Sequence, residues 1–455
     1  MSTKINKKSF YKMIITIGLP IALQNLITFS VSMADTIMLG HASYDDELIS
    51  AADLANKPIF LLIITLFGLA MGGLTLASQY WGKGDVKTIR RITAMILQMG
   101  VLISAAAGVF VLVFPAVTMR IFTNNEIVIQ KGVEYLQIVG WSYFLVGFSI
   151  MMTIMLRSVE VVRVALFASI AALVLNIPLN WLLIFGNFGF PELGIQGAAI
   201  GTVIARAAEF MIIAVYVFLI DKKLKFRFKD VFDFDKTLFK DIMKYGFPVL
   251  FNEVAWASGI TVQAMIVGRI DYVEGDFVAA NAANGVIFQL FMVAMFGTAN
   301  AALVIVGKAI GEGKLDEAKI KADMLFKIGA FMGIAVCFLI IATRHFIIGI
   351  FGLSPETEEL AKELLIYGGI IAFFASVATM SIVGVFRGGG DTRFCLIIEV
   401  ACMWGLAVPL AAVLAFYFQF PVWIVYLGMK SDEIVKTVIC FIRIRGVKWI
   451  KILTR

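Results

Sequence analysis

Histidine and cysteine are scarce in this chain of 455 residues, which contains two histidines and four cysteines. The cysteines lie in apolar stretches and show neither the close spacing of a zinc site nor a paired arrangement; they are Cys337, Cys395, Cys402 and Cys440. The sequence therefore predicts neither a metal centre built on these residue types nor a disulfide framework.

The motifs of ATP-driven and catalytic proteins are also missing. No phosphate-binding loop of the form Gly-x-x-x-x-Gly-Lys-Ser/Thr occurs, and no set of nucleophile and base converges on one segment. The three glycines at 388–390 follow a hydrophobic segment rather than a strand, so they predict a tight turn instead of a phosphate site. We therefore expect neither an enzyme nor a bound cofactor.

Charged residues are few, at 16% of the chain against 60% hydrophobic residues, whereas a soluble domain has about 25% charged residues. This composition predicts an integral membrane protein in a lipid bilayer. The first apolar run, near residues 13–40, is too long for a signal peptide and has no small-residue cleavage site, so we expect it to remain as a span. We attribute the net charge of +7 to cytoplasmic loops and expect no nucleic-acid partner.

Twelve hydrophobic segments have about the length that a membrane-spanning helix requires. They lie near residues 13–40, 58–80, 92–118, 132–156, 164–186, 194–220, 245–270, 277–306, 324–351, 363–386, 394–417 and 420–442. Charges interrupt the last segment, which is predicted to be a short span that continues into an amphipathic cytoplasmic helix. Most of the 39 lysines and arginines fall in alternate loops, on the side of both termini. By the positive-inside rule, both termini are expected in the cytoplasm, below a plasma or inner membrane.

The two halves of the chain repeat short patterns at nearly constant offsets. The Gly-x-Pro at 18–20 recurs 228 positions later at 246–248, and Arg157 recurs 230 positions later as Arg387. Because six spans per half is an even number, both halves enter the membrane in the same direction. We therefore predict an all-α protein with two six-helix parallel repeats, related by a pseudo-twofold axis along the membrane normal, as in many secondary transporters.

A long polar and basic loop lies between the two halves. We expect residues 1–220 to form an N-terminal six-helix bundle and 221–244 a cytoplasmic linker. Residues 245–455 are expected to form the C-terminal bundle with a basic cytoplasmic tail.

Asp35 is the one acid in the first apolar segment. A charge at the centre of a membrane helix costs about 2.5–3.5 kcal/mol, so such a residue predicts a functional site that faces the protein interior. The alternative is an acid at the water interface, because Gly40 follows five residues later. Three other charged residues have structural explanations: Arg206 and Glu209 are expected to pair, and Glu399 is expected to reach the interface.

Longer motifs resemble those of the multidrug and toxic compound extrusion (MATE) family, most of all its NorM-type members. They lie at residues 34–40 (Ala-Asp-Thr-Ile-Met-Leu-Gly), 175–181 (Leu-Asn-Ile-Pro-Leu-Asn-Trp), 191–199 (Pro-Glu-Leu-Gly-Ile-Gln-Gly-Ala-Ala) and 386–392 (Phe-Arg-Gly-Gly-Gly-Asp-Thr). The resemblance covers nearly the whole chain. It implies a secondary antiporter that exports organic cations or drugs in exchange for Na⁺ or H⁺ by alternating access.

The resemblance also implies an ion-coupling site. The family's first-span acid, fifteen residues after a proline, corresponds to Asp35 after Pro20, and this proline is a candidate hinge because it removes a backbone hydrogen bond. The fifth-span polar pair corresponds to Asn176 and Asn180, and the sixth-span hydroxyl to Thr202. These oxygen ligands suit Na⁺, and the same groups are able to hydrogen-bond a protonated Asp35. The asparagines are alternatively explained as hydrogen bonds between helices.

The second half differs from the first in its charges. Glu253 in the seventh span resembles a glutamate of NorM-type members, about one turn displaced, and is a candidate for a second cation or substrate site. The tenth-span acid of those members is replaced by Ser376 here, which favours Asp35 for ion coupling. In the register of the repeat, Asp35 corresponds to Gln263 and Glu253 to Asn25.

Two other functions fit the sequence less well. A flippase for lipid-linked precursors, from the same broad superfamily, needs a cavity rimmed with basic residues, and few lie within the predicted spans, Arg206 and Lys327 among them. An intramembrane enzyme needs a clustered catalytic set, which the sequence lacks. We therefore expect a monomeric exporter of small cationic molecules, with Na⁺ or H⁺ as the coupling ion.

Overall fold

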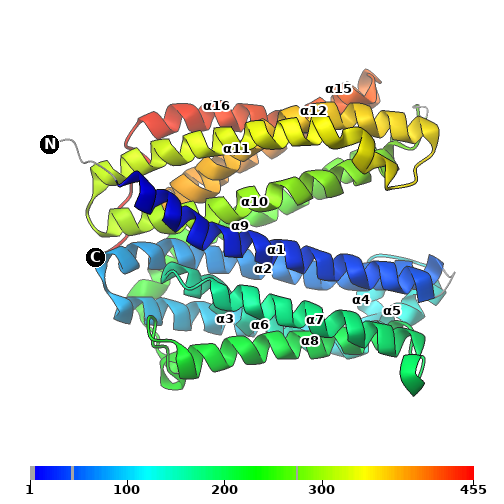
Figure 1. Ribbon diagram of the computed structural model, residues 1–455, viewed down its shortest axis with the longest axis horizontal. Helices are drawn as coiled ribbons and strands as arrows, with labels where there is room; N and C mark the ends of the chain where they lie inside the picture. The colour runs from blue at the N-terminus through cyan, green and yellow to red at the C-terminus, as the bar shows by residue number, and fades with distance from the viewer. Residues whose placement is uncertain (1–5, 43–45, 273–274) are drawn as a thin grey trace. The chain divides into compact units, whose positions relative to one another are not determined.

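The computed structural model describes residues 6–42, 46–272 and 275–455, which form helices joined by loops, with no strand in those ranges (Figure 1). Side chains at 32–37, 39–42, 46, 47 and 49 lie outside this description. Ten of the described helices are long and apolar enough to cross a membrane. An eleventh span results if α5 (Glu126–Val139) and α6 (Ser142–Ser158), which meet at 57°, count as one. The predicted all-α membrane class is confirmed.

The predicted twelfth segment forms two helices. They are α15 (Val422–Met429) and α16 (Ser431–Arg445), and Lys430 lies between them. α15 is uniformly apolar, whereas α16 carries acids in its first turn and arginines in its last turn. The count of twelve spans therefore stays a prediction.

The chain divides into two compact units. The N-terminal unit comprises residues 23–77 and 85–243, and the C-terminal unit comprises residues 1–22, 78–84 and 244–455. Two long helices, α1 (Lys7–Ala42) and α2 (Asp46–Lys83), contribute residues to both units. The division into bundles at residues 220 and 244 stays a prediction.

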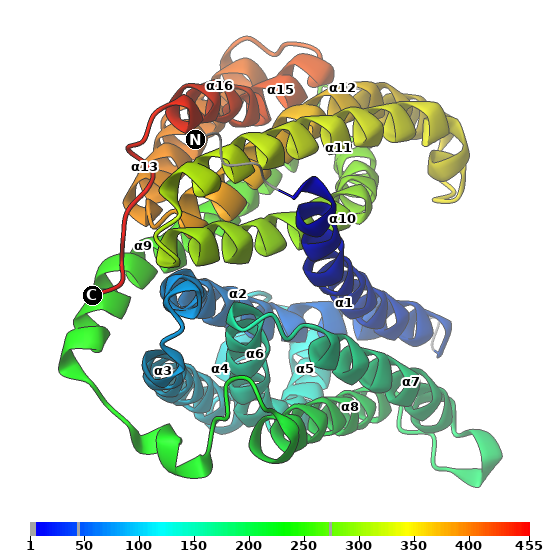
Figure 2. The same cartoon turned by 60° about the vertical axis from the view of Figure 1, so that its left-hand side comes forward.

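The N-terminal unit is built on two helix pairs. Its other elements are α3 (Val86–Val113), α4 (Pro115–Arg120), α5, α6, α7 (Arg163–Phe185) and α8 (Ile195–Val215, continued as a π-helix to Ile220), with short 3-10 turns at Asn187–Gly189 and Phe228–Phe232. α7 packs along α8, and α3 packs along α6 (Figure 2). Glycines permit this approach: a Cβ added at Gly197 of α8 would lie 2.5 Å from the carbonyl oxygen of Leu183 on α7. Small residues serve this purpose in membrane helices, where close backbone packing drives association.

The C-terminal unit packs its helices in the same way. It contains most of α9 (Lys236–Val267), then α10 (Phe277–Gly311), α11 (Leu315–Gly349), α12 (Pro355–Thr379, continued to Phe386), α13 (Thr392–Cys402), α14 (Val408–Ala412), α15 and α16. α11 lies along α12, α10 packs on both, and α16 packs on α12 and α13 (Figure 2). At Gly333 of α11, an added Cβ would lie 2.9 Å from the carbonyl oxygen of Phe373 on α12.

The glycine-rich stretch after α12 forms a turn, as predicted. Gly390 has φ of +82°, a conformation that favours glycine, and the N–H of Asp391 donates to the carbonyl of Phe386 at 2.9 Å. The C-terminal segment 446–455 packs on this turn. The N–H of Lys451 donates to the carbonyl of Gly389 at 2.8 Å, and Trp449 is fully buried against the same glycine.

Candidate functional site

A buried amide pair lies inside the N-terminal unit. Asn176 and Asn180 are one turn apart on α7, on the same face of the helix, and neither side chain has exposed surface. The Nδ2 of Asn180 donates to the Oδ1 of Asn176 at 3.4 Å. The sequence predicted this pairing on one face, and the structure adds that the face is turned into the unit.

α8 brings a glycine to this amide pair, and the residue that follows it on α8 carries a buried hydroxyl. A Cβ added at Gly201 would overlap the Oδ1 of Asn180, so only glycine leaves room for that amide. Thr202 follows Gly201, and its hydroxyl oxygen is buried. Within the described residues, neither this hydroxyl nor the Nδ2 of Asn176 has a hydrogen-bond partner. Because unsatisfied buried polar atoms are costly and rare, both atoms call for a partner: an acceptor such as water or a carboxylate for the Nδ2 of Asn176, and water or an ion for the hydroxyl of Thr202.

The first-span residues of the predicted site are described only in part. The side chain of Asp35 lies outside the described residues. The backbone of α1 runs through Pro20 as one helix from Lys7 to Ala42. The hinge at Pro20 and the ion-coupling role of Asp35 stay predictions.

Glu253 lies beside an arginine that the sequence analysis did not connect with it. On α9 its carboxylate lies 2.6 Å from the Nη1 of Arg387, which is 2% exposed. The neighbouring Asn252 accepts a hydrogen bond from Arg387 and donates to the carbonyl of Cys395 at 3.0 Å. The arginine therefore neutralises Glu253, and the role of this glutamate in a cation site stays a prediction.

The same arginine–amide contact occurs in the N-terminal unit, where sequence reasoning did not find it. The Nη2 of Arg157 donates to the Oε1 of Gln24 at 3.3 Å. Gln24 and Asn252 are 228 positions apart, and Arg157 and Arg387 are 230 apart, so equivalent positions of the repeat make equivalent contacts. The offsets were visible in the sequence, but they do not show which side chains meet.

Two further predictions about charged residues had different outcomes. Arg206 and Glu209 form an ion pair at 2.9 Å, as predicted. Glu399 does not reach an interface, because it is 5% exposed and its carboxylate lies 2.8 Å from Lys436 on α16. That expectation was wrong because a basic partner on another helix makes burial of the acid tolerable.

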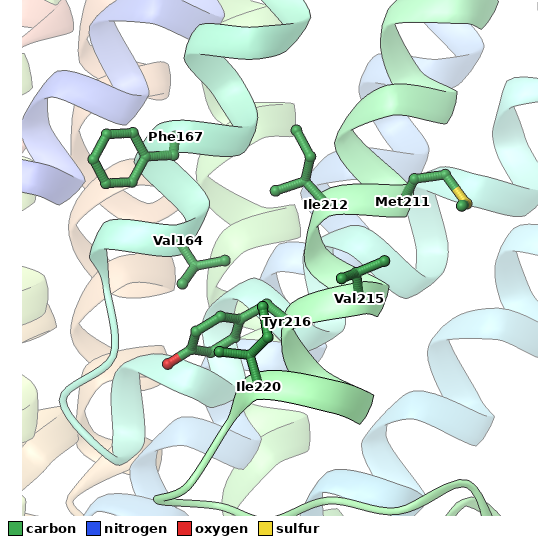
Figure 3. Close-up of a pocket in the computed structure, with 7 residues that line it drawn as sticks. All are labelled: Val164, Phe167, Met211, Ile212, Val215, Tyr216 and Ile220. Atoms are coloured by element: carbon green, nitrogen blue, oxygen red, sulfur yellow. The ribbon is translucent and has the colours of Figure 1, made fainter.

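A shallow apolar cavity of about 400 Å³ lies on the N-terminal unit, away from the amide pair (Figure 3). Val164 and Phe167 of α7 line one wall, and Met211 of α8 lies opposite, with Tyr216 below. Phe167 precedes Asn176 by nine residues, about 13 Å along the helix. Apart from the hydroxyl of Tyr216 the lining side chains are apolar, which suits acyl chains or another apolar molecule better than an ion.

Known proteins resemble this chain over almost its full length. The family model MatE matches residues 20–182 and 248–413, two stretches that begin at the two prolines of the repeated Gly-x-Pro. The chain belongs to the MatE family. The predicted family resemblance is confirmed, and the chain is a multi-pass membrane transporter rather than an enzyme.

Among curated relatives, a "Probable multidrug resistance protein NorM" of Thermotoga maritima is 26% identical and covers 98% of this chain and 94% of its own length. The "Uncharacterized transporter YisQ" of Bacillus subtilis is 25% identical, over 95% and 93% of the two chains. A solved structure titled as the outward-facing conformation of a multidrug resistance MATE family transporter has a TM-score of 0.85 at 19% identity, covering 96% of each chain. A transporter of the MOP superfamily from Pyrococcus furiosus has a TM-score of 0.84 at 20% identity, also over 96% of each chain. These structures support the fold.

Proposed function

We propose that this transporter exports organic cations, including drugs, in exchange for Na⁺ or H⁺. The observation that carries the proposal is the buried polar region of α7 and α8, where Asn176 and Thr202 each keep a buried polar atom without a partner among the described residues. The multidrug-resistance names of several relatives support the substrate class. The carboxylate in this mechanism is Asp35.

The mechanism is alternating access, driven by binding of the coupling ion to the carboxylate of Asp35. In the outward-facing state an ionised Asp35 takes up the coupling ion, which favours substrate release outside and return to the inward-facing state. Two unit charges 4 Å apart interact by about 4 kcal/mol at an effective dielectric of 20. A swing of a two-state equilibrium from 1:99 to 99:1 requires about 5.5 kcal/mol, so one such interaction supplies most of it.

The setting of this cycle is a plasma or inner membrane, with both termini in the cytoplasm and a monomeric protein. The loops rich in lysine and arginine support this orientation. The flippase alternative is disfavoured because Arg206, a basic residue within a predicted span, is already paired with Glu209.

The test is efflux of ethidium from proteoliposomes under an imposed Na⁺ gradient and, separately, under an imposed pH gradient. We expect one or both gradients to drive efflux, and Asp35→Asn to abolish gradient-driven efflux while the protein still inserts and folds. Glu209→Gln serves as a control, because its carboxylate already has an arginine partner. Wild-type efflux rates in Asp35→Asn would refute the assignment.

A further inference from the structure

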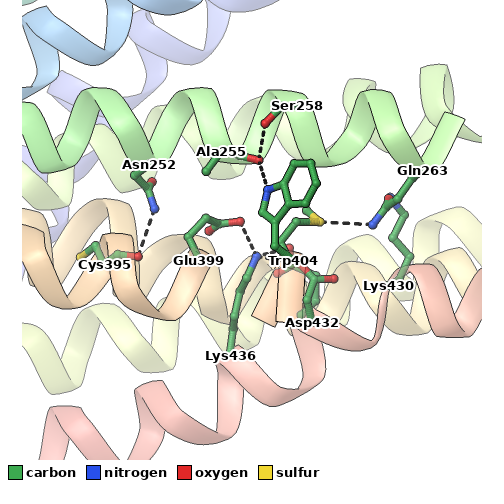
Figure 4. A network of polar contacts seen from close by, with 12 residues as sticks. Asn252, Ala255, Ser258, Gln263, Cys395, Glu399, Trp404, Lys430, Asp432 and Lys436 are labelled. Atoms are coloured by element: carbon green, nitrogen blue, oxygen red, sulfur yellow. Dashed lines mark hydrogen bonds and ion pairs between the residues drawn. The ribbon is translucent and has the colours of Figure 1, made fainter. Parts of the chain in front are cut away.

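A second cluster of ionisable groups lies buried in the C-terminal unit (Figure 4). The ammonium of Lys436 on α16 lies 2.7 Å from Asp432, 2.8 Å from Glu399 and 3.4 Å from Glu433. Lys436 is 2% exposed and Asp432 1%, whereas the side chain of Glu433 keeps 18% of its surface exposed. We call these four residues the Lys436 cluster.

Neighbouring elements contribute mostly neutral groups. Lys430 is the nearest further charge: it donates to the Oε1 of Gln263 on α9 at 3.3 Å and acts electrostatically on Glu433. Glu253 acts on Glu399 from α9, but Arg387 already neutralises it. From α12, the carbonyl of Phe374 accepts from Thr437. Thiols also face the cluster, from Cys395 and Cys402 on α13 and from Cys440 on α16.

The charges of this region do not balance. Glu399, Asp432 and Glu433 supply three negative charges when ionised, and Lys436 and Lys430 supply two positive charges. Elsewhere on these helices Arg387 pairs with Glu253, and the carboxylate of Asp391 pairs with both Arg443 and Lys451, whose side chains are 25% and 41% exposed. The acids of those pairs therefore have at least as many bases as partners, unlike the acids of the Lys436 cluster. An uncompensated charge in a protein interior is so costly that the group takes up a proton instead.

We propose that the Lys436 cluster binds one proton, shared among its three carboxylates, and exchanges it during the transport cycle. Within the described residues, no group of three His, Cys, Asp or Glu side chains is placed to hold a metal ion, and these carboxylates converge on an ammonium group. The ligand is therefore a proton rather than a metal cation. Glu433 is the acid through which it enters, because it alone keeps appreciable exposed surface.

The location also favours a role in transport. Gln263 reaches Lys430 beside the cluster, and in the register of the repeat Gln263 corresponds to Asp35. The two halves thus carry ionisable groups around equivalent positions of their first helices. In the N-terminal half the acid is Asp35, which lies on the first helix, α1. In the C-terminal half the acids of the Lys436 cluster lie on α13 and α16 instead.

Proton binding is testable without transport. Infrared spectra of purified protein at neutral pH, in an Asp35→Asn background, report protonated carboxyl groups through their C=O band and its shift in D₂O. Charge balance predicts one protonated carboxyl in the intact cluster, none after Glu433→Gln, and two after Lys436→Met. Glu209→Gln, which removes an acid already paired with Arg206, should leave the band unchanged.

The infrared band should disappear in Glu433→Gln but grow in Lys436→Met. A general loss of folding would not change the band in opposite directions, so the two variants together test charge balance. If Lys436→Met fails to fold, Asp432→Asn replaces it and should remove the band as Glu433→Gln does. A band of unchanged size in Glu433→Gln or in Asp432→Asn would overturn the proposal, as would a smaller band in a folded Lys436→Met.

Exchange during the cycle rests on the proposed antiport function and is tested separately. In proteoliposomes, Glu433→Gln should reduce ethidium efflux driven by a pH gradient about tenfold or more. Unchanged efflux in a variant that has lost the infrared band would overturn exchange but not proton binding. Efflux that survives Asp35→Asn would instead overturn the proposed function and leave the infrared result standing.

Discussion

The side-chain oxygen of Gln79, near the end of α2, accepts a hydrogen bond from the backbone N–H of Leu453 at 2.8 Å. The Nε2 of the same residue donates to the carbonyl of Gly388 at 3.2 Å and to that of Lys451 at 3.0 Å. One fully buried side chain therefore satisfies three backbone groups, in the glycine turn and in the C-terminal segment. Through it, the last residues of the chain hold the end of α2.

Replacement of Gln79 should loosen the C-terminal segment. Gln79→Leu leaves two carbonyls and one N–H without their partner, and each such buried group costs about 1–3 kcal/mol. We expect a lower melting temperature of the purified protein and faster proteolysis after residue 445. Gln130→Leu is the control, because Gln130 is exposed on α5. Equal melting temperatures for the two variants would contradict the role of Gln79.

The glycine turn depends on a close contact with Trp449. A Cβ added at Gly389 would lie 2.6 Å from the Trp449 ring and 2.6 Å from its carbonyl oxygen. Gly389→Ala should therefore cost about 1–3 kcal/mol through overpacking, measured as a lower melting temperature. Gly349→Ala is the matched control, because nothing lies within 4 Å of an added Cβ there. If both variants have the same melting temperature, the C-terminal segment does not pack on the glycine turn in solution.

The Glu253–Arg387 pair should contribute to stability mainly through charge balance. Arg387→Met leaves the mostly buried carboxylate of Glu253 without its partner, which costs about 3–5 kcal/mol. The double variant with Glu253→Gln should recover most of that loss, as measured by denaturation of the purified protein. For comparison, Arg120→Met removes a pair with Glu126 whose side chains are 62% and 73% exposed, and should cost less than about 1 kcal/mol. A double variant as unstable as Arg387→Met would argue against charge balance.

Gly201 should matter for transport more than for folding. Gly201→Ala places a methyl group where the Oδ1 of Asn180 now lies, so the amide must turn away from the polar region of α7 and α8. We expect gradient-driven ethidium efflux to fall about tenfold or more, with insertion into the membrane retained. Gly285→Ala, where an added Cβ meets no atom within 4 Å, should keep wild-type efflux. Normal efflux in Gly201→Ala would remove Asn180 from the proposed site.

Local patterns in the sequence predicted the features that depend on neighbouring residues. Hydrophobic length predicted the apolar helices, because an apolar run of about 20 residues has few alternatives to a membrane-spanning helix. The glycines at 388–390 predicted the turn, and the spacing of Asn176 and Asn180 predicted a shared face. The face of a helix on which a residue lies follows from spacings of three or four positions, so such features can be predicted from the sequence.

Contacts between distant residues were not predicted in this way. Glu399 and Lys436 are 37 positions apart, and Gln79 and Leu453 are 374 apart. No sequence period links them, and which side chains meet depends on how the helices cross and rotate against one another. This is why Glu399 was expected at an interface and why the contact of Glu253 with Arg387 was not predicted.

The sequence by itself determined that this protein is a helical membrane transporter, because span length, charge placement and family motifs are local properties of the chain. Only the tertiary structure decided which charges are neutralised and which are left in excess. The cost of burying a charge depends on the partners that other helices bring within a few ångströms, and helix packing alone sets those distances.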